Sequence, residues 1–240
     1  GVLVKKGNGQ LNLTYGGTNG YAGAVLYAGT LAQGAWNATL GKSGSSIDVA
    51  GNASISVFNN NSTSAVPTLT NSINVQKGKT LTLNTGQRCK IQGRLTGEGT
   101  VKISFPYVRG DFETNCAAFE GKLNPTSGQF RISNTLDLSK GTFELGAGVY
   151  VANVKSQSAT EESRTNKIGA LQSTATDASF GTGTWNVGYL GMNTTFAGKF
   201  NSSAPLNKYG EGVLTLTGAS ENSINIYAGE LQAQNTSAPI

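Results

Sequence analysis

The residues best suited to acid–base chemistry in this sequence are its 13 carboxylates, because the chain of 240 residues contains no histidine. Glycoside hydrolysis needs two carboxylates facing one groove, ~5 to 9.5 Å apart. The aspartates are far apart in sequence and none forms an Asp-Asp or Asp-x-Asp pair: Asp48, Asp111, Asp137 and Asp177. Without histidine, most general-base triads and most zinc, copper and non-haem iron sites are also excluded. We therefore predict no catalytic residue, no metal site and no cofactor, and we expect a protein that is not an enzyme.

Two pairs of carboxylates lie close together in the sequence. Asp111 and Glu113 are expected to share one face of a strand beside Arg109. They would form either an acidic–basic cluster in a groove or, as we favour, a solvated strand ladder. Arg109-Gly110-Asp111 also spells the tripeptide that integrins recognise in some host proteins, but recognition needs an exposed loop tip and we do not expect it.

The second pair, Glu161 and Glu162, belongs to a polar segment, 158–170. Ser158 and Glu161 fit a helix capping box. The segment lacks an apolar stripe, so we predict a polar loop with at most one or two helical turns and a solubilising role for the two glutamates.

The net charge of +5 raises the question of a polyanionic partner. The 18 basic residues are scattered, however, and the longest basic run is Lys5-Lys6. Nucleic-acid binders cluster such residues on one face, so we expect no nucleic-acid partner. No apolar stretch approaches the ~18 residues that cross a bilayer, so we predict no transmembrane segment.

The two cysteines, Cys89 and Cys116, are too few for a disulfide scaffold. Aligning residues 91–95 with 119–123 places Cys89 opposite Ala117. An offset of one residue along a strand turns a side chain to the other face. We therefore expect the thiols to remain unpaired.

The elements that must position these side chains are short strands. Segments such as Leu81-Thr82-Leu83 and Val101-Lys102-Ile103 alternate apolar and polar residues and are bounded by Gly, Asn, Ser or Asp. Period-2 alternation without a long helical pattern indicates an all-β chain.

Internal repeats indicate which all-β architecture the chain forms. Leu3-x-Lys5-x-Gly7-x-Gly9-x-Leu11 recurs as Leu206-x-Lys208-x-Gly210-x-Gly212-x-Leu214, and each copy is followed by Tyr-Ala-Gly-x-Leu, at 27–31 and 227–231. Shorter Gly-x-Gly phrases occur at 97–103 and 181–187, and Phe-x-Gly-Lys occurs at 119–122 and 196–199.

Such repeats indicate a solenoid whose coils stack apolar residues inside and pair their backbones above and below. We predict a single domain, 1–240, that forms a right-handed parallel β-helix. At roughly 20 to 28 residues per coil it would have about 9 to 12 coils. The alternative is a β-sandwich.

Aromatic residues could stack on sugar rings if they share an exposed face; the candidates are Trp36, Tyr107, Trp185, Tyr189 and Tyr209. Trp185 occupies a repeat position that Leu11 and Leu214 fill elsewhere, so we expect it in the core. Tyr27 and Tyr227 are expected to form structural stacks. No ligand-binding residue can be assigned from these positions.

The repeated phrase resembles the autotransporter-associated β-strand repeat, which reads roughly Leu-x-Lys-x-Gly-x-Gly-Thr-Leu-x-Leu followed by Ala-Gly-x-Leu. Gln10 and Val213 stand where that family prefers Thr. The family forms right-handed parallel β-helices in exported bacterial proteins, often in surface adhesins.

The resemblance implies a piece of a longer protein, at the bacterial cell surface or secreted, that serves adhesion or display. Its partner would be a host or neighbouring-cell surface ligand, with a glycan as one candidate. The alternatives are a polysaccharide-binding module and a β-helix of the polysaccharide lyase or hydrolase type.

Overall fold

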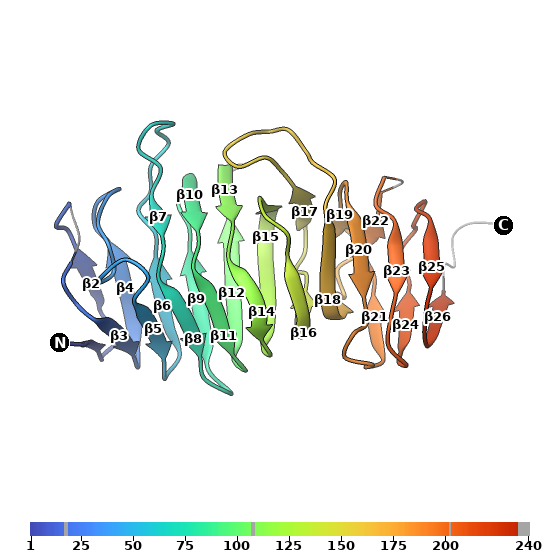
Figure 1. Cartoon of the computed structure of the whole chain (residues 1–240), viewed down its shortest axis with the longest axis horizontal. Coiled ribbons are helices and arrows are strands. Elements are labelled where there is room, and N and C mark those ends of the chain that lie inside the picture. The colour runs from blue at the N-terminus through green and yellow to red at the C-terminus, as the bar shows by residue number, and fades with distance from the viewer. Residues whose placement is uncertain (17–18, 107–108, 202, 235–240) are drawn as a thin grey trace.

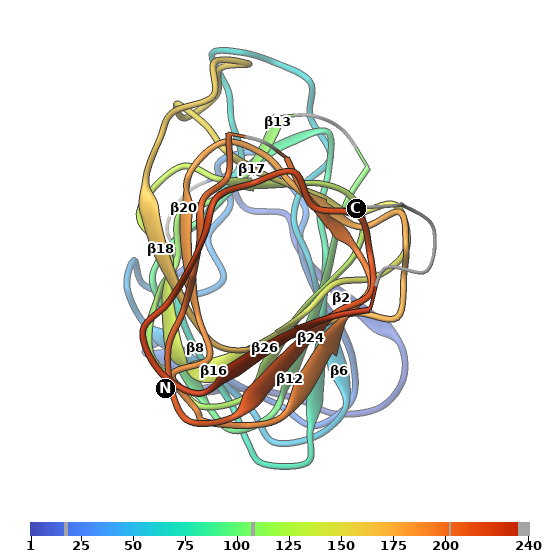
Figure 2. The ribbon, with the colours of Figure 1, turned by 90° about the vertical axis from the view of Figure 1, so that its right-hand side faces the viewer.

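The protein is a parallel β-solenoid of about eleven turns without a helix in the described residues (Figure 1). The computed structural model describes residues 1–16, 19–106, 109–201 and 203–234. Viewed along the long axis, successive turns superimpose on one ring (Figure 2). Every pairing between named strands is parallel in the described chain, which excludes the β-sandwich.

Each complete turn has three sides, here called the first, second and third faces. The first face begins as a six-stranded sheet. Its strands are β1 (Leu3–Lys5), β3 (Gly23–Leu26), β5 (Ser46–Val49), β8 (Ser72–Val75), β11 (Arg94–Gly97) and β14 (Asn115–Phe119). The second face begins with β2 (Gln10–Leu13), β4 (Gly29–Gln33), β6 (Ala53–Ser56), β9 (Thr80–Asn84), β12 (Thr100–Phe105) and the start of β15 (Lys122–Ile132).

The third face is made of β7 (Thr68–Leu69), β10 (Arg88–Ile91), β13 (Arg109–Phe112), the end of β15, β17 (Tyr150–Asn153), β19 (Ser179–Phe180) and β22 (Lys199–Phe200). Turns are numbered from the N-terminus, so that turn 1 begins with β1 and each later turn begins at the next strand of the first face. In turns 7 and 8 the long strands β16 (Asp137–Glu144) and β18 (Thr165–Gln172) run from the first face into the second. The last turns have β20 (Thr184–Val187), β23 (Leu206–Lys208) and β25 (Ile224–Ile226) on the first face, and β21 (Thr194–Phe196), β24 (Val213–Leu216) and β26 (Glu230–Ala233) on the second.

The length of a turn varies more than the repeats predict. Asn207 pairs with Asn225, eighteen residues later, whereas Asp137 pairs with Lys167, thirty residues later. The extra residues of the long turn form the segment 154–164, which leaves the third face as a loop over the neighbouring turns (Figure 1). This segment contains no helix, and residues 165–170 belong to β18.

The core is formed by the apolar residues that alternate along each strand and point inward. On the first face Leu26, Val49 and Val75 are stacked in register and fully buried. From turn 5 to turn 9 the core becomes aromatic, with Phe130 packed between Phe105 and Phe143 at centroid distances of 5.8 and 5.6 Å. These stacks fill the interior, so the ring of Figure 2 is a packed core.

The two cysteines are buried and free, as expected. The register that led to this expectation was wrong, because Cys89 in β10 pairs with Gly110 in β13, whereas Cys116 lies in β14 on the first face. The thiols therefore belong to different faces. Burial, reinforced by the charge of Asp111, raises the pKa of Cys89 to about 12. Burial also raises the pKa of Cys116, so both side chains remain protonated and unreactive near neutral pH.

Candidate functional site

The lysine of the repeated phrase, Lys5 in the first copy, has a defined structural role. Lys5 stands at the inward position that Leu26 and Val49 occupy in the next two turns. Its Nζ donates hydrogen bonds to the carbonyl oxygens of Lys6 (3.0 Å), Gly7 (2.6 Å) and Ala28 (3.0 Å). The ammonium group therefore joins the corner of turn 1 to the corner of turn 2.

The second copy repeats this arrangement. Lys208 is 1% exposed and donates to the carbonyl oxygens of Tyr209 (2.6 Å), Gly210 (2.6 Å) and Ala228 (3.3 Å). Burial lowers the pKa of Lys208, and the charge of Glu211 acts in the opposite direction. The Leu-x-Lys-x-Gly phrase and the Tyr-Ala-Gly phrase therefore recur together because they meet at one corner.

Asp111 is the clearest departure from the sequence expectations. It was expected on a solvated ladder, and that is wrong, because Asp111 is fully buried. Its Oδ1 accepts a hydrogen bond from Nε of Arg131 at 2.8 Å, and its Oδ2 accepts one from the backbone N–H of Gln157 at 2.5 Å. Arg131 is itself 1% exposed and also donates to the carbonyl of Ser158.

The segment 154–164 is what buries this ion pair. It crosses from turn 7 back to β13 in turn 5 (Figure 1). Gln157 has a φ of 53° and is the only non-glycine residue with positive φ in the described part of the chain. Such a conformation persists where the surroundings hold it, and the hydrogen bonds to Asp111 supply that restraint.

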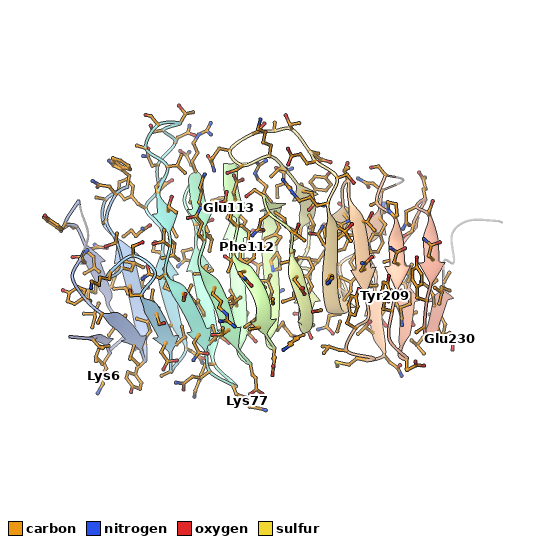
Figure 3. The ribbon with its side chains drawn as sticks, in the orientation of Figure 1. Lys6, Lys77, Phe112, Glu113, Tyr209 and Glu230 are labelled. Atoms are coloured by element: carbon orange, nitrogen blue, oxygen red, sulfur yellow. The ribbon has the colours of Figure 1, made fainter. Side chains whose placement is uncertain are left out.

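Glu113 extends the cluster of Asp111, Arg131 and Gln157 toward the surface. Figure 3 labels it together with its neighbour Phe112. Its Oε1 accepts from Ser133 (3.0 Å) and Ser156 (2.6 Å), and its Oε2 accepts from Gln92 (2.6 Å). Burial acts to raise the pKa of Glu113, but these hydrogen bonds and the nearby Lys90 outweigh it and hold the pKa below its ordinary value.

This cluster does not have the geometry of a hydrolase site. Both oxygens of Asp111 are taken by protein donors, and the side chain has no exposed surface from which to meet a substrate. Asp48, Asp137 and Asp177 lie in turns 3, 7 and 8. Within the described residues, no three His, Cys, Asp or Glu side chains gather closely enough to hold a metal ion.

The integrin tripeptide lies in a strand instead of at a loop tip. Residues 109–112 form β13, and Asp111 is the buried partner of Arg131. The carboxylate of Asp111 is therefore not exposed at this tripeptide. The side chain of Arg109 lies outside the described residues.

Glu161 anchors the loop instead of merely solubilising it. Glu161 accepts hydrogen bonds from the hydroxyl of Tyr150 (2.5 Å) and the backbone N–H of Thr182 (3.3 Å). Burial and the bond to Glu161 raise the pKa of Tyr150. Glu162 forms an ion pair with Arg164. The capping box predicted for Ser158 and Glu161 is absent, since Ser158 bonds Thr160.

The aromatic predictions are partly confirmed. Trp185 is fully buried, as expected, although it lies in β20 on the first face and not on the face of Leu11 and Leu214. Tyr227 stacks on Tyr209 at 4.8 Å, and Tyr209 stacks on Tyr189 at 4.9 Å.

Tyr27 does not join a stack among the described aromatic residues. Tyr27 instead lies under the ammonium of Lys6, which is 5.3 Å from its ring centroid. Tyr107 lies outside the described residues.

An open groove on the second face has a volume of about 730 Å³. It lies where β18 ends at Gln172 and where only an isolated bridge, Ser173 to Phe196, links the sheet to β21. Apart from Leu145, Gly146 and the backbone, its lining consists of hydroxyl, amide and carboxylate side chains. None of the described residues that line it is aromatic, so the search of the sequence for aromatic platforms does not indicate this groove.

Comparison with protein-family models, curated proteins and solved structures finds no match for this chain. Among the residues that the structure describes, no helix is long and apolar enough to span a membrane.

Proposed function

We propose that this chain is a non-enzymatic segment of a bacterial surface or secreted protein, in which the solenoid serves adhesion or display. The supporting observation is the stack of about eleven turns, with the same lysine corner near both ends. A scaffold of this kind holds groups at fixed spacing along its axis and needs no reacting centre.

The proposal includes membership of the autotransporter-associated β-strand repeat family. Its basis is the sequence resemblance of the two long copies together with the position of both copies at the corner between the first and second faces. The proposed partner is a host or neighbouring-cell surface ligand.

The experiment compares adhesion with turnover. Beads coated with the chain are expected to adhere to cell surfaces more strongly than beads coated with an inert protein. Incubation with pectic and host glycans is expected to yield neither new reducing ends nor unsaturated products. Sustained turnover would overturn the non-enzymatic proposal, and adhesion equal to that of the inert control would overturn the adhesive one.

A further inference from the structure

A row of polar side chains follows the outside of the second face, one side chain per turn, through the groove described above. Asn124 in β15 lies beside Glu144 in β16, and Glu144 pairs with Gln172 in β18. Because Ser173 bridges to Phe196, Gln172 lies beside Thr195, and Thr195 pairs with Thr215 in β24. This row, Asn124, Glu144, Gln172, Thr195 and Thr215, is called the groove ladder.

The spacing of the groove ladder is set by the backbone. Adjacent strands are ~4.8 Å apart, which is similar to the advance per ring along an extended pyranose polymer. Asn124 is 8% exposed and its amide donates to the backbone carbonyl of Glu144, so the accessible part of the ladder is the four positions of turns 7 to 10. One extended glycan chain parallel to the solenoid axis would meet one of these polar side chains for each ring. A folded small molecule would not use this periodicity.

The hydrogen-bonding groups of the groove complement a polyol. Glu144 accepts from Lys122 (2.6 Å) and Gln172 (2.5 Å), and both bonds end on its Oε2. In the described structure Oε1 receives no hydrogen bond and is not a buried unsatisfied atom, so it is exposed as an acceptor. Thr195 is exposed and adds a hydroxyl, which both donates and accepts.

The charge of the groove favours a neutral ligand. Among the described lining residues Glu144 alone is charged, and Lys122 pairs with it. An anionic polymer would meet this carboxylate, and a cationic one would meet Lys122 and the nearby Lys102. An apolar peptide would find no apolar pocket, since Leu145 is buried.

We propose that this groove binds a neutral polysaccharide chain along the groove ladder. The inference rests on the adhesive role proposed above and gives it a ligand class and a site. The hydrogen-bonded contacts, and the absence of aromatic stacking in the lining, predict modest affinity for one chain.

The test measures binding of the full chain to hydroxyethylcellulose and galactomannan, with polygalacturonate as the anionic counterpart, by affinity electrophoresis. Thr195→Tyr fills the groove from an exposed position, and we expect binding at least about ten-fold weaker. Thr195→Val removes only the hydroxyl, and we expect about two- to ten-fold weaker binding.

Thr165→Tyr is the matched control, because Thr165 is an exposed strand threonine on the first face. It should bind as the parent chain does, and circular dichroism should show all variants folded. Equal binding by Thr195→Tyr and the parent would overturn the site, and binding to polygalacturonate alone would overturn the ligand class.

Failure of this inference is distinguishable from failure of the proposed function. Adhesion of coated beads without binding to either neutral polymer would overturn the groove proposal and leave the adhesive role standing. Turnover of a bound polymer would overturn the non-enzymatic proposal.

Discussion

The end turns and the middle turns of the solenoid stabilise buried charged groups in different ways. Lys5 and Lys208 are satisfied by backbone carbonyls of their own corner and of the next turn. Asp111 in the middle depends on Arg131, twenty residues away, and on Gln157, forty-six residues away. The end arrangement is local and repeats with the sequence, whereas the middle arrangement occurs once and requires three turns and a loop.

The largest effect is expected from separating the middle ion pair. Arg131→Met would leave Asp111 buried without its cationic partner, which costs about 3–5 kcal/mol. Urea-induced unfolding followed by circular dichroism would measure the loss. The double variant Asp111→Leu/Arg131→Met should recover most of the stability, because it removes both charges. A loss below about 1 kcal/mol for Arg131→Met would show that the pair is not what holds the loop.

Substitution of Gly29, the glycine at the corner of turn 2, is expected to have the next largest effect on the free energy of unfolding. Gly29 has a φ of +72°, and a Cβ there would be 2.4 Å from the carbonyl oxygens of Gly7 and Gly9. Gly29→Ala should cost about 2–4 kcal/mol from the backbone conformation and the overlap together. Gly7→Ala is the matched control, since Gly7 has the same φ but open space around a Cβ. Equal losses in the two variants would mean that the corner relaxes to accept the methyl group.

The lysine corners should respond alike at the two ends. Lys208→Met keeps an unbranched apolar stem but removes the hydrogen bonds to three carbonyl oxygens. We expect a loss of about 1.5–3 kcal/mol, and the same range for Lys5→Met, measured as hydrogen-exchange protection of the adjoining strands. A large loss at one end and none at the other would refute the equivalence of the two corners.

Acid should destabilise the middle of the molecule, and this is the smallest of these effects. The pKa of Glu113 lies below its ordinary value of 4.5, so the folded state favours the ionised form. Its contribution to stability is present above about pH 4.5 and is lost as the pH falls through the lower folded value. Thermal melting between pH 7 and 3 should show this fall, and Glu113→Gln should reduce its slope. A slope unchanged by that substitution would assign the acid sensitivity to other carboxylates.

The long repeats predicted the fold well because each copy encodes the same corner between two strands. Lys5 and Lys208, with the glycines that follow them, lie at the same kind of corner in both copies. The shorter Gly-x-Gly phrases predicted corners, but they did not indicate between which two faces each corner lies. Gly97 ends a strand of the first face, whereas the similar phrase at Gly181 precedes β20 and leads into the first face.

The middle cluster could not be predicted, because its partners are distant in sequence and belong to a loop without periodicity. Strand alternation indicates that Asp111 points outward, and an outward carboxylate is normally solvated. Only the return of residues 154–164 over the third face buries it. The groove escaped prediction for a similar reason, since it arises where β18 and β21 pair through a single bridge.

The segment 154–164 also changes how the molecule is expected to unfold. Turns joined only to their neighbours can fray one at a time from an end. Gln157 in turn 7 is bonded to the carbonyl of Cys89 in turn 4 and to Asp111 in turn 5, so none of these turns can detach without breaking contacts to the others. We therefore expect turns 4 to 7 to open together as one cooperative block, which would give a linear, repetitive chain a centre from which folding propagates toward both ends.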